Sequence, residues 1–195
     1  MRTSTYSEAD LGYFRKHFRT LEEVCTGRPE TPDEVRRLID ERKLPQPSYV
    51  LDDGTELVPA DYFRFVDVAG SVDGLREEYE RRYRLALASN GLGFDIELFD
   101  RRWEQFLDGI SGICMQEVTP EAIVRKRVLI DEIEKLLAEP APGDETWQQR
   151  LRESVDELDR IEKPFAPDHD RDGRFVPTRD TYIRDVRRSY PKAWE

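Results

Sequence analysis

The chain has 195 residues, enough for one domain or two small ones with a real hydrophobic core. Its 42 acidic side chains outnumber its 31 lysines and arginines, which gives a net charge of −11, and only 37% of its residues are hydrophobic. This acidity disfavours general affinity for nucleic acids or anionic membranes, because the chain repels phosphate groups and anionic lipid headgroups.

Capping signals mark three helices near the start of the chain. Ser7 is a favourable N-cap, and Leu11, Phe14 and Phe18 after it form a one-sided apolar stripe. The next two helices begin with capping boxes, in which a threonine and a glutamate three residues later satisfy each other's free backbone N–H groups. The boxes are Thr20 with Glu23 and Thr31 with Glu34. We therefore predict helices that follow residues 7, 20 and 31.

A β-hairpin is predicted next. Asp53-Gly54 lies between two short runs that favour strands, residues 48–51 and 56–58. An Asp-Gly pair in this setting is a strong hairpin signal, because both residues accept the backbone angles of a tight turn. Pro59 is then expected to open another helix, which carries Tyr62, Phe63, Phe65 and Val66.

From about Ser71 onward the pattern predicts helices only. Apolar residues at helical spacing occupy residues 72–88 and 95–107; after a break at residues 108–112 a long helix starts at Thr119, residues 144–161 form the next helix, and a short final helix starts at Thr178. In the helix that starts at Thr119 the apolar stripe is Ile123, Ile130, Ile133 and Leu137. The Pro-rich connection at residues 140–143 is short, so the last two long helices are expected to pair antiparallel. The predicted fold is mainly α, with a winged-helix-like unit at 1–70 and an α-helical unit at 71–195.

Within the first unit, the segment of about residues 20–66 resembles a winged helix-turn-helix of the MerR and excisionase type. The resemblance rests on the run from Asp33 to Pro45, the Asp-Gly turn and the segment Val58–Phe63. It implies that the second helix enters the major groove of DNA and that the hairpin contacts phosphates. The residues that would read DNA are Arg36, Arg37, Arg42 and Lys43.

The local charge argues against this use of the module. Residues 1–66 hold 10 basic and 13 acidic side chains, and four carboxylates interrupt the helix that would read DNA. We therefore expect its arginines to pair with neighbouring carboxylates rather than with phosphates. In that case the module serves as a packing or docking surface, since a fold does not fix a function.

An aspartate-rich loop is a weak calcium candidate. Asp168, Asp170 and Asp172 alternate and Gly173 follows, as in the first half of an EF-hand loop. The twelfth position, which should supply a bidentate glutamate, is Arg179. The favoured interpretation is a solvated loop, and no metal or cofactor is predicted.

Few residues suggest a catalytic set. The two histidines, His17 and His169, form no local pair with a nucleophile. Cys114 lies in an apolar segment and is interpreted as a small buried hydrophobe rather than a reactive thiolate. The run 125–127 (Arg-Lys-Arg) covers almost one helical turn and is interpreted as a solvated face, with an anion or partner contact as the alternative.

The location is predicted to be cytoplasmic. No apolar stretch approaches the roughly 20 residues that span a bilayer, and the polar first ten residues lack the apolar core of a signal peptide. Cys25 and Cys114 lie far apart with no metal-ligand spacing, which is typical of a reducing compartment. We accordingly expect no membrane association.

The whole chain is similar to an uncharacterised actinobacterial family whose members are labelled natural-product biosynthesis proteins. The resemblance is carried by five sequence segments: Thr20–Cys25, Leu44–Val50, Leu107–Cys114, Val118–Glu121 and Glu162–Pro167. The resemblance implies a pathway setting, and it supplies no catalytic residues.

The sequence leaves three functions open. The leading hypothesis is a non-catalytic accessory or protein-interaction protein of bacterial natural-product biosynthesis, with a protein partner or a second copy of itself. The first alternative is a MerR-like transcriptional regulator, which the charge disfavours. The second is a cofactor-independent enzyme whose site lies between the two units.

Overall fold

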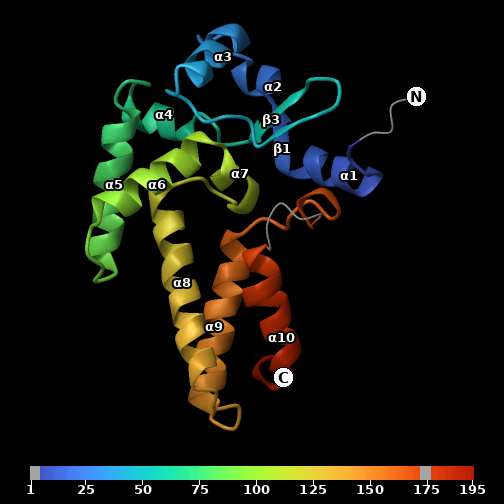
Figure 1. Cartoon of the computed structure of the whole chain (residues 1–195), viewed down its shortest axis with the longest axis vertical. Coiled ribbons are helices and arrows are strands. Elements are labelled where there is room, and N and C mark those ends of the chain that lie inside the picture. Colours follow the sequence, from blue (N-terminus) through green and yellow to red (C-terminus); the bar gives the residue numbers. More distant parts are fainter. Residues whose placement is uncertain (1–4, 172–176) are drawn as a thin grey trace.

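The computed structural model describes residues 5–171 and 177–195, and its fold is mainly helical, as predicted (Figure 1). Its small antiparallel sheet has three strands in the order β1-β3-β2. The first part of the chain forms α1 (Glu8–His17), β1 (Phe18–Thr20), α2 (Leu21–Cys25), α3 (Pro32–Asp40), β2 (Tyr49–Val50), β3 (Glu56–Pro59) and α4 (Arg64–Ala69). The rest forms α5 (Leu75–Ser89), α6 (Ile96–Leu107), α7 (Ile110–Cys114), α8 (Pro120–Ala138), α9 (Glu145–Ile161) and α10 (Asp185–Ser189), with short 3₁₀ or π turns at His169–Arg171, Asp180–Arg184 and Pro191–Trp194.

The predicted helix caps form as expected. Ser7, Thr20 and Thr31 each accept a hydrogen bond from the backbone N–H three residues later, and all three complete a capping box. Thr119 and Asp144 cap α8 and α9 without a capping box: Thr119 accepts from Ala122 N, and Asp144 accepts from Thr146 N and Trp147 N. Local sequence chemistry therefore sets where these helices begin.

The predicted hairpin forms, and one further strand joins it. β2 pairs with β3 through Tyr49 opposite Leu57. On its other edge β3 pairs with β1, where Phe18 lies opposite Pro59. The prediction took Phe18 as the end of the first helical stripe, whereas the structure has it leave α1 and enter the sheet with its side chain buried.

Two boundaries differ from the prediction. Pro59 ends β3 rather than opening a helix, and α4 begins only at Arg64. The expected break at residues 108–112 contains the start of α7, which follows Gly109 in the left-handed conformation. Both differences arise where tertiary pairing decides between a turn and a short helix.

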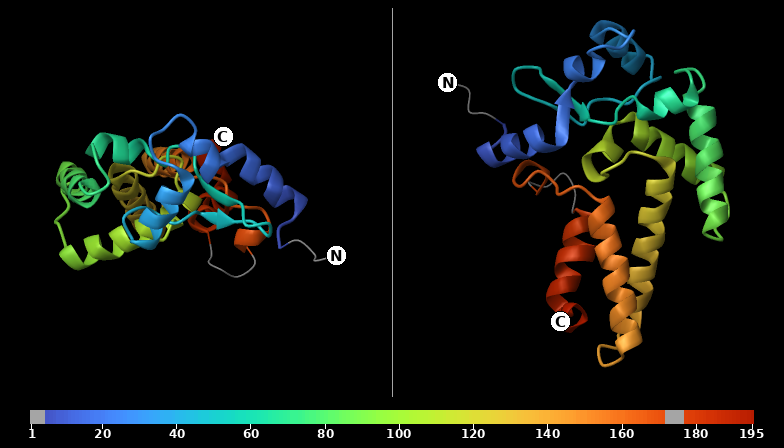
Figure 2. Two further views of the ribbon diagram at one scale, coloured as in Figure 1. Left: turned by 90° about the horizontal axis from the view of Figure 1, so that it is seen from above. Right: turned by 180° about the vertical axis from the view of Figure 1, so that it is seen from behind.

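The last two long helices pair antiparallel, as predicted. Arg125 on α8 forms an ion pair with Glu157 on α9, and Arg150 on α9 pairs with Glu132 on α8. Buried apolar side chains from both helices and from the segment that contains α10 form one cluster. Both Figure 1 and the right panel of Figure 2 show α8, α9 and α10 side by side, extending away from the sheet.

The largest hydrophobic core crosses the predicted boundary at residue 70. Val58 and Phe65 on one side of it share this cluster with Tyr79 and Phe106 on the other. The division into 1–70 and 71–195 stays a prediction, and the two stretches meet through a continuous core. Among the described residues, no helix combines the length and apolar character needed to cross a membrane.

Candidate functional site

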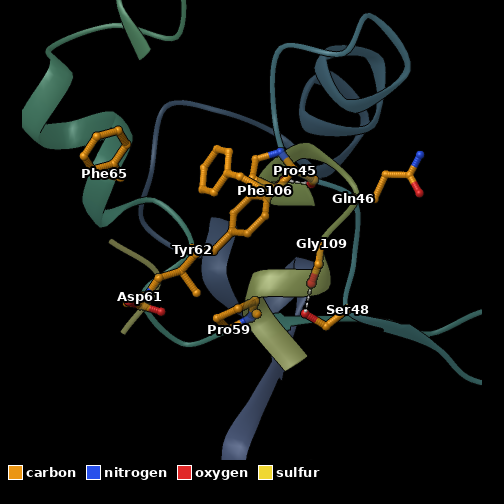
Figure 3. A pocket seen from close by; sticks show the side chains of 11 residues that line it. Pro45, Gln46, Ser48, Pro59, Asp61, Tyr62, Phe65, Phe106 and Gly109 are labelled. Carbon is orange, nitrogen blue, oxygen red and sulfur yellow. Dashed lines mark hydrogen bonds between the residues drawn. The ribbon is translucent and has the colours of Figure 1, made fainter. Parts of the chain in front are cut away.

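The seam between the two predicted units is closed. The linker before β2 is fastened to α6 and α7: Gln46 N–H donates to Leu107 O at 2.8 Å, and Ser48 Oγ donates to Gly109 O at 3.2 Å (Figure 3). The cavity among these residues holds about 20 Å³, which is room for roughly one water molecule. At the linker before β2, the seam therefore offers no space for a substrate; a second cavity between the two stretches, lined by Arg64, Arg82 and Val118 among others, holds about 110 Å³.

Two glycines allow this close approach. A Cβ added at Gly109 would lie 2.4 Å from the carbonyl oxygen of Gln46, and one at Gly112 would lie 2.4 Å from Ser48 Oγ. Gly109 also has a φ of 73°, which a side chain strongly disfavours. The glycines at the start of α7 thus fix its position against the linker.

A larger groove lies between α6, α7 and α8. Its volume is about 550 Å³, within the range of small-molecule sites. Its apolar lining consists of Leu98, Ile110, Cys114, Met115, Ile123, Ile130 and Phe165. Ile110 remains 45% exposed at this groove. The remaining lining residues are Arg102, Gln105, Ser111, Lys126, Arg127, Asp131, Glu134 and Thr178.

A buried ion pair supports the groove at Lys126 and Thr178. Lys126 Nζ lies 2.8 Å from Glu162 Oε1, and the Thr178 hydroxyl donates to the same oxygen at 2.5 Å. Glu162 has no exposed surface, and its second carboxylate oxygen has no hydrogen-bond partner in the described part of the chain. A buried carboxylate in this position holds the Lys126 ammonium in a fixed place.

The potentially reactive groups of the groove are held protonated. Burial raises the pKa of the Cys114 thiol. Desolvation alone would lower the pKa of Lys126, but the ion pair with Glu162 outweighs it and keeps that pKa above its usual value. A neutral thiol and a charged ammonium are both poor nucleophiles.

The charges along the groove differ in how they are compensated. Lys126 pairs with Glu162, and Arg127 lies 3.7 Å from Asp131 one turn further along α8. Arg102 is different: within residues 5–171 and 177–195 it has no carboxylate partner, and it donates to the neutral amide of Gln105 at 2.8 Å. Arg102 therefore has no ion-pair partner among the described residues, and the lining carboxylate of Glu134 accepts a hydrogen bond from the Tyr182 hydroxyl.

A second buried lysine lies outside the groove. Lys163 is 3% exposed, and its Nζ donates to Gly112 O at 3.0 Å and lies 4.6 Å from the centre of the Phe18 ring. Burial lowers its pKa to about 8, although Asp61 and Cys114 oppose the shift. Lys163 ties the segment after α9 to α7 and β1.

The residues predicted to read DNA are ion-paired. Arg36 contacts three carboxylates, those of Glu22, Asp33 and Glu56, at 2.5–3.0 Å. The other three pair as follows: Arg37 with Glu41, Arg42 with Glu104 and Asp108, and Lys43 with Glu41 and Asp73. The expected pairing with neighbouring carboxylates is present. Arg42 in particular is directed to α6 rather than to an open face.

Part of the aspartate-rich loop has a structural role. Asp170 is fully buried, and its Oδ2 accepts hydrogen bonds from Tyr49 Oη at 2.6 Å and Ala166 N at 2.8 Å. Asp168 is exposed, and Asp172 lies outside the described residues. Across the described parts of the chain, no three potential metal-binding side chains gather into one group.

The sequence contained a signal for the groove that the prediction did not use. It placed Ile123 and Ile130 on the same apolar stripe of α8 as Ile133, whereas the structure buries Ile133 against α9 and leaves the other two half-exposed in the groove. Apolar residues on two sides of one helix indicate two packed surfaces. The basic run 125–127 was interpreted as a solvated face, yet Lys126 points inward to Glu162.

Comparison with known proteins identifies a family and no individual relative. No curated protein and no solved structure matches the chain. One family model, described as a family of unknown function (DUF6058), matches residues 75–191. The match begins at α5, covers more than half of the chain and includes α6, α7 and α8 of the groove. The chain therefore belongs to the DUF6058 family.

Proposed function

We propose that this protein is a non-catalytic accessory protein of bacterial natural-product biosynthesis, and that it binds a pathway component in the groove between α6, α7 and α8. The observation that carries the proposal is the groove itself. It combines a volume of about 550 Å³ and a mainly apolar lining with a few fixed polar groups. Sites of this kind are typical of ligand binding.

The protonation of the groove supports binding over catalysis. The raised pKa values of Cys114 and Lys126 leave a thiol and an ammonium at neutral pH. Neither is the nucleophilic form. The pathway setting is supported by the sequence phrases that resemble natural-product biosynthesis proteins, such as Leu107–Cys114, which spans the start of α7.

A protein partner or a second copy of the chain is also part of the proposal. Large apolar side chains remain more than half exposed at Val50 on β2, Val68 on α4, Leu85 on α5 and Ile96 on α6. Exposed apolar side chains are the kind that contacts between proteins bury. The regulator alternative has weaker support, because Arg36, Arg37, Arg42 and Lys43 already have carboxylate partners.

Gene deletion with metabolite profiling tests the proposal. The deletion strain is complemented with the wild type, with Cys114→Ser, which removes the thiol, and with Ile130→Asp, which places a charge in the groove. We expect Cys114→Ser to restore the metabolite profile and Ile130→Asp to fail, while both purified variants retain the circular dichroism spectrum of the wild type.

The intermediate that accumulates in the deletion strain is the material for a second experiment. Incubation of the purified wild type with this intermediate should leave it unchanged. Turnover of the intermediate by the purified protein alone would show that the protein is an enzyme.

A further inference from the structure

A positively charged side chain lies on the α6 wall of the groove. Leu98, Arg102 and Gln105 lie on one face of α6, spaced four and three residues apart. The facing surface of α8 supplies two isoleucines, Ile123 and Ile130. The apolar part of the groove thus has a cation on its α6 wall.

Arg102 is the lining cation without ionic compensation. Among the described residues, Lys126 and Arg127 have carboxylate partners, whereas the partner of Arg102 is the amide of Gln105 at 2.8 Å. Arg102 is half-buried, so part of its hydration is already lost. A guanidinium in this state gains from a planar anion that can accept two hydrogen bonds, which is the geometry of a carboxylate.

The charge contrast with the rest of the molecule sharpens the assignment. The chain carries a net charge of −11, whereas the charges at the groove balance, because three cations and two carboxylates line it and buried Glu162 offsets Lys126. An anionic ligand is therefore repelled less here than by most of the surface, and its attraction comes from Arg102. The volume of about 550 Å³ suits a small molecule.

We infer that the groove binds a small molecule with an apolar body and one carboxylate, with the apolar body between Ile123, Ile130 and Ile110 and the carboxylate on Arg102. This assignment rests on the proposed function, and it adds the chemical class of the ligand. Arg102 is then the residue that distinguishes an acid from its neutral or cationic counterpart.

Calorimetric titration with two soluble probes tests the assignment. Decanoate and decyltrimethylammonium share the same apolar chain and carry opposite charges. We expect saturable binding of decanoate to one site, and affinity at least about tenfold lower for decyltrimethylammonium, because the cation lacks the paired hydrogen bonds to Arg102. Absence of saturable decanoate binding, or equal affinity for both probes, would overturn the assignment.

Variants of neighbouring arginines supply the matched controls. Arg102→Gln should lower the affinity for decanoate about tenfold or more, Arg102→Lys should retain part of it, and Arg101→Gln, on the exposed side of the same helix, should leave it unchanged. Thermal melts confirm that each variant is folded. Equal affinity of wild type and folded Arg102→Gln would contradict the role of Arg102.

The binding results, taken with complementation and turnover, distinguish a failure of this assignment from a failure of the proposed function. If decanoate fails to bind while Ile130→Asp still abolishes complementation, the groove remains the functional surface and the ligand class is wrong. If decanoate binds through Arg102 and the purified protein also turns over the pathway intermediate, the ligand class stands and the non-catalytic function is wrong.

Discussion

The ammonium of Lys126 lies 2.8 Å from the carboxylate of Glu162, a side chain with no exposed surface. This contact joins α8 to the segment that follows α9, at the wall of the groove. A buried pair of this kind is costly to break, because removal of one partner leaves the other charge uncompensated away from water.

Glu162→Gln is therefore expected to lower the free energy of unfolding by about 3 kcal/mol, and Lys126→Met by a similar amount. The double variant should lose less than the sum of the two single variants, because it leaves no unpaired charge. Urea unfolding of the wild type and the three variants measures this coupling. Strictly additive losses would show that the two groups do not interact.

The lowered pKa of Lys163 predicts that the stability of the protein depends on pH. Burial lowers its pKa to about 8 in the folded chain, whereas an unfolded lysine has a value of about 10.4. Between these values the unfolded state binds more protons, so the stability of the folded protein rises with pH. Below about pH 8 the buried ammonium costs its full penalty.

Lys163→Met isolates this effect. From pH 7 to pH 9.5 the wild type should gain about 2 kcal/mol relative to Lys163→Met, measured by urea unfolding at both values. Lys192→Met, at an exposed lysine near the end of the chain, is the control and should show no such gain. Parallel pH profiles for wild type and Lys163→Met would contradict the lowered pKa.

The close packing of α7 makes Gly112 intolerant of a side chain. Gly112→Ala brings a methyl group against Ser48 Oγ and Pro59 Cγ, at 2.4 and 2.7 Å before relaxation. We expect a loss of about 1–3 kcal/mol from overpacking, measured by denaturant unfolding.

Gly12→Ala is the matched control for this substitution. Gly12 lies on the exposed side of α1 with no atom near its added Cβ, so the change should stabilise the chain by about 0.5–1 kcal/mol. A neutral effect of Gly112→Ala would show that α7 moves freely against the linker.

How far the sequence predicts this fold depends on the range of the interactions. Ser7, Thr31, Thr119 and Asp144 act within one helical turn, so the helix starts follow from local chemistry. β1 forms only because β3 arrives from about 40 residues further along the chain. No local pattern at Phe18 reports that pairing, and the prediction extended the helix through it.

The groove, too, could be predicted from the sequence only in part. Its walls come from α6, α7 and α8, and Phe165 and Thr178 complete it from beyond α9. Only the two-sided apolar pattern of α8 is visible in the sequence. The partners of Arg36 could be anticipated from the acidic residues nearby, whereas the inward turn of Lys126 to Glu162 depends on the α8–α9 hairpin.

The arginines of α3 serve the fold in this account. Arg36→Ala should cost about 1 kcal/mol, because it leaves the carboxylates of Glu22, Asp33 and Glu56 without their shared partner, while Arg37→Ala breaks one exposed pair and should cost less than about 0.5 kcal/mol.

The same arginines predict weak interaction with DNA. Fluorescence anisotropy with a labelled duplex from the protein's own operon, at low salt, should show no saturable binding. Binding that weakens with salt and disappears when Arg36→Glu and Arg37→Glu are combined would favour the regulator instead.

Isoleucine methyl NMR tests the central claim, that the groove is the binding site of this protein, most directly. Ile110, Ile123 and Ile130 line the groove, while Ile39 and Ile183 are buried in other parts of the molecule. Addition of decanoate to the labelled protein should shift the first three methyl signals in a saturable manner and leave the last two unchanged. Saturable shifts confined to methyl groups outside the groove, or no shifts at all, would contradict it.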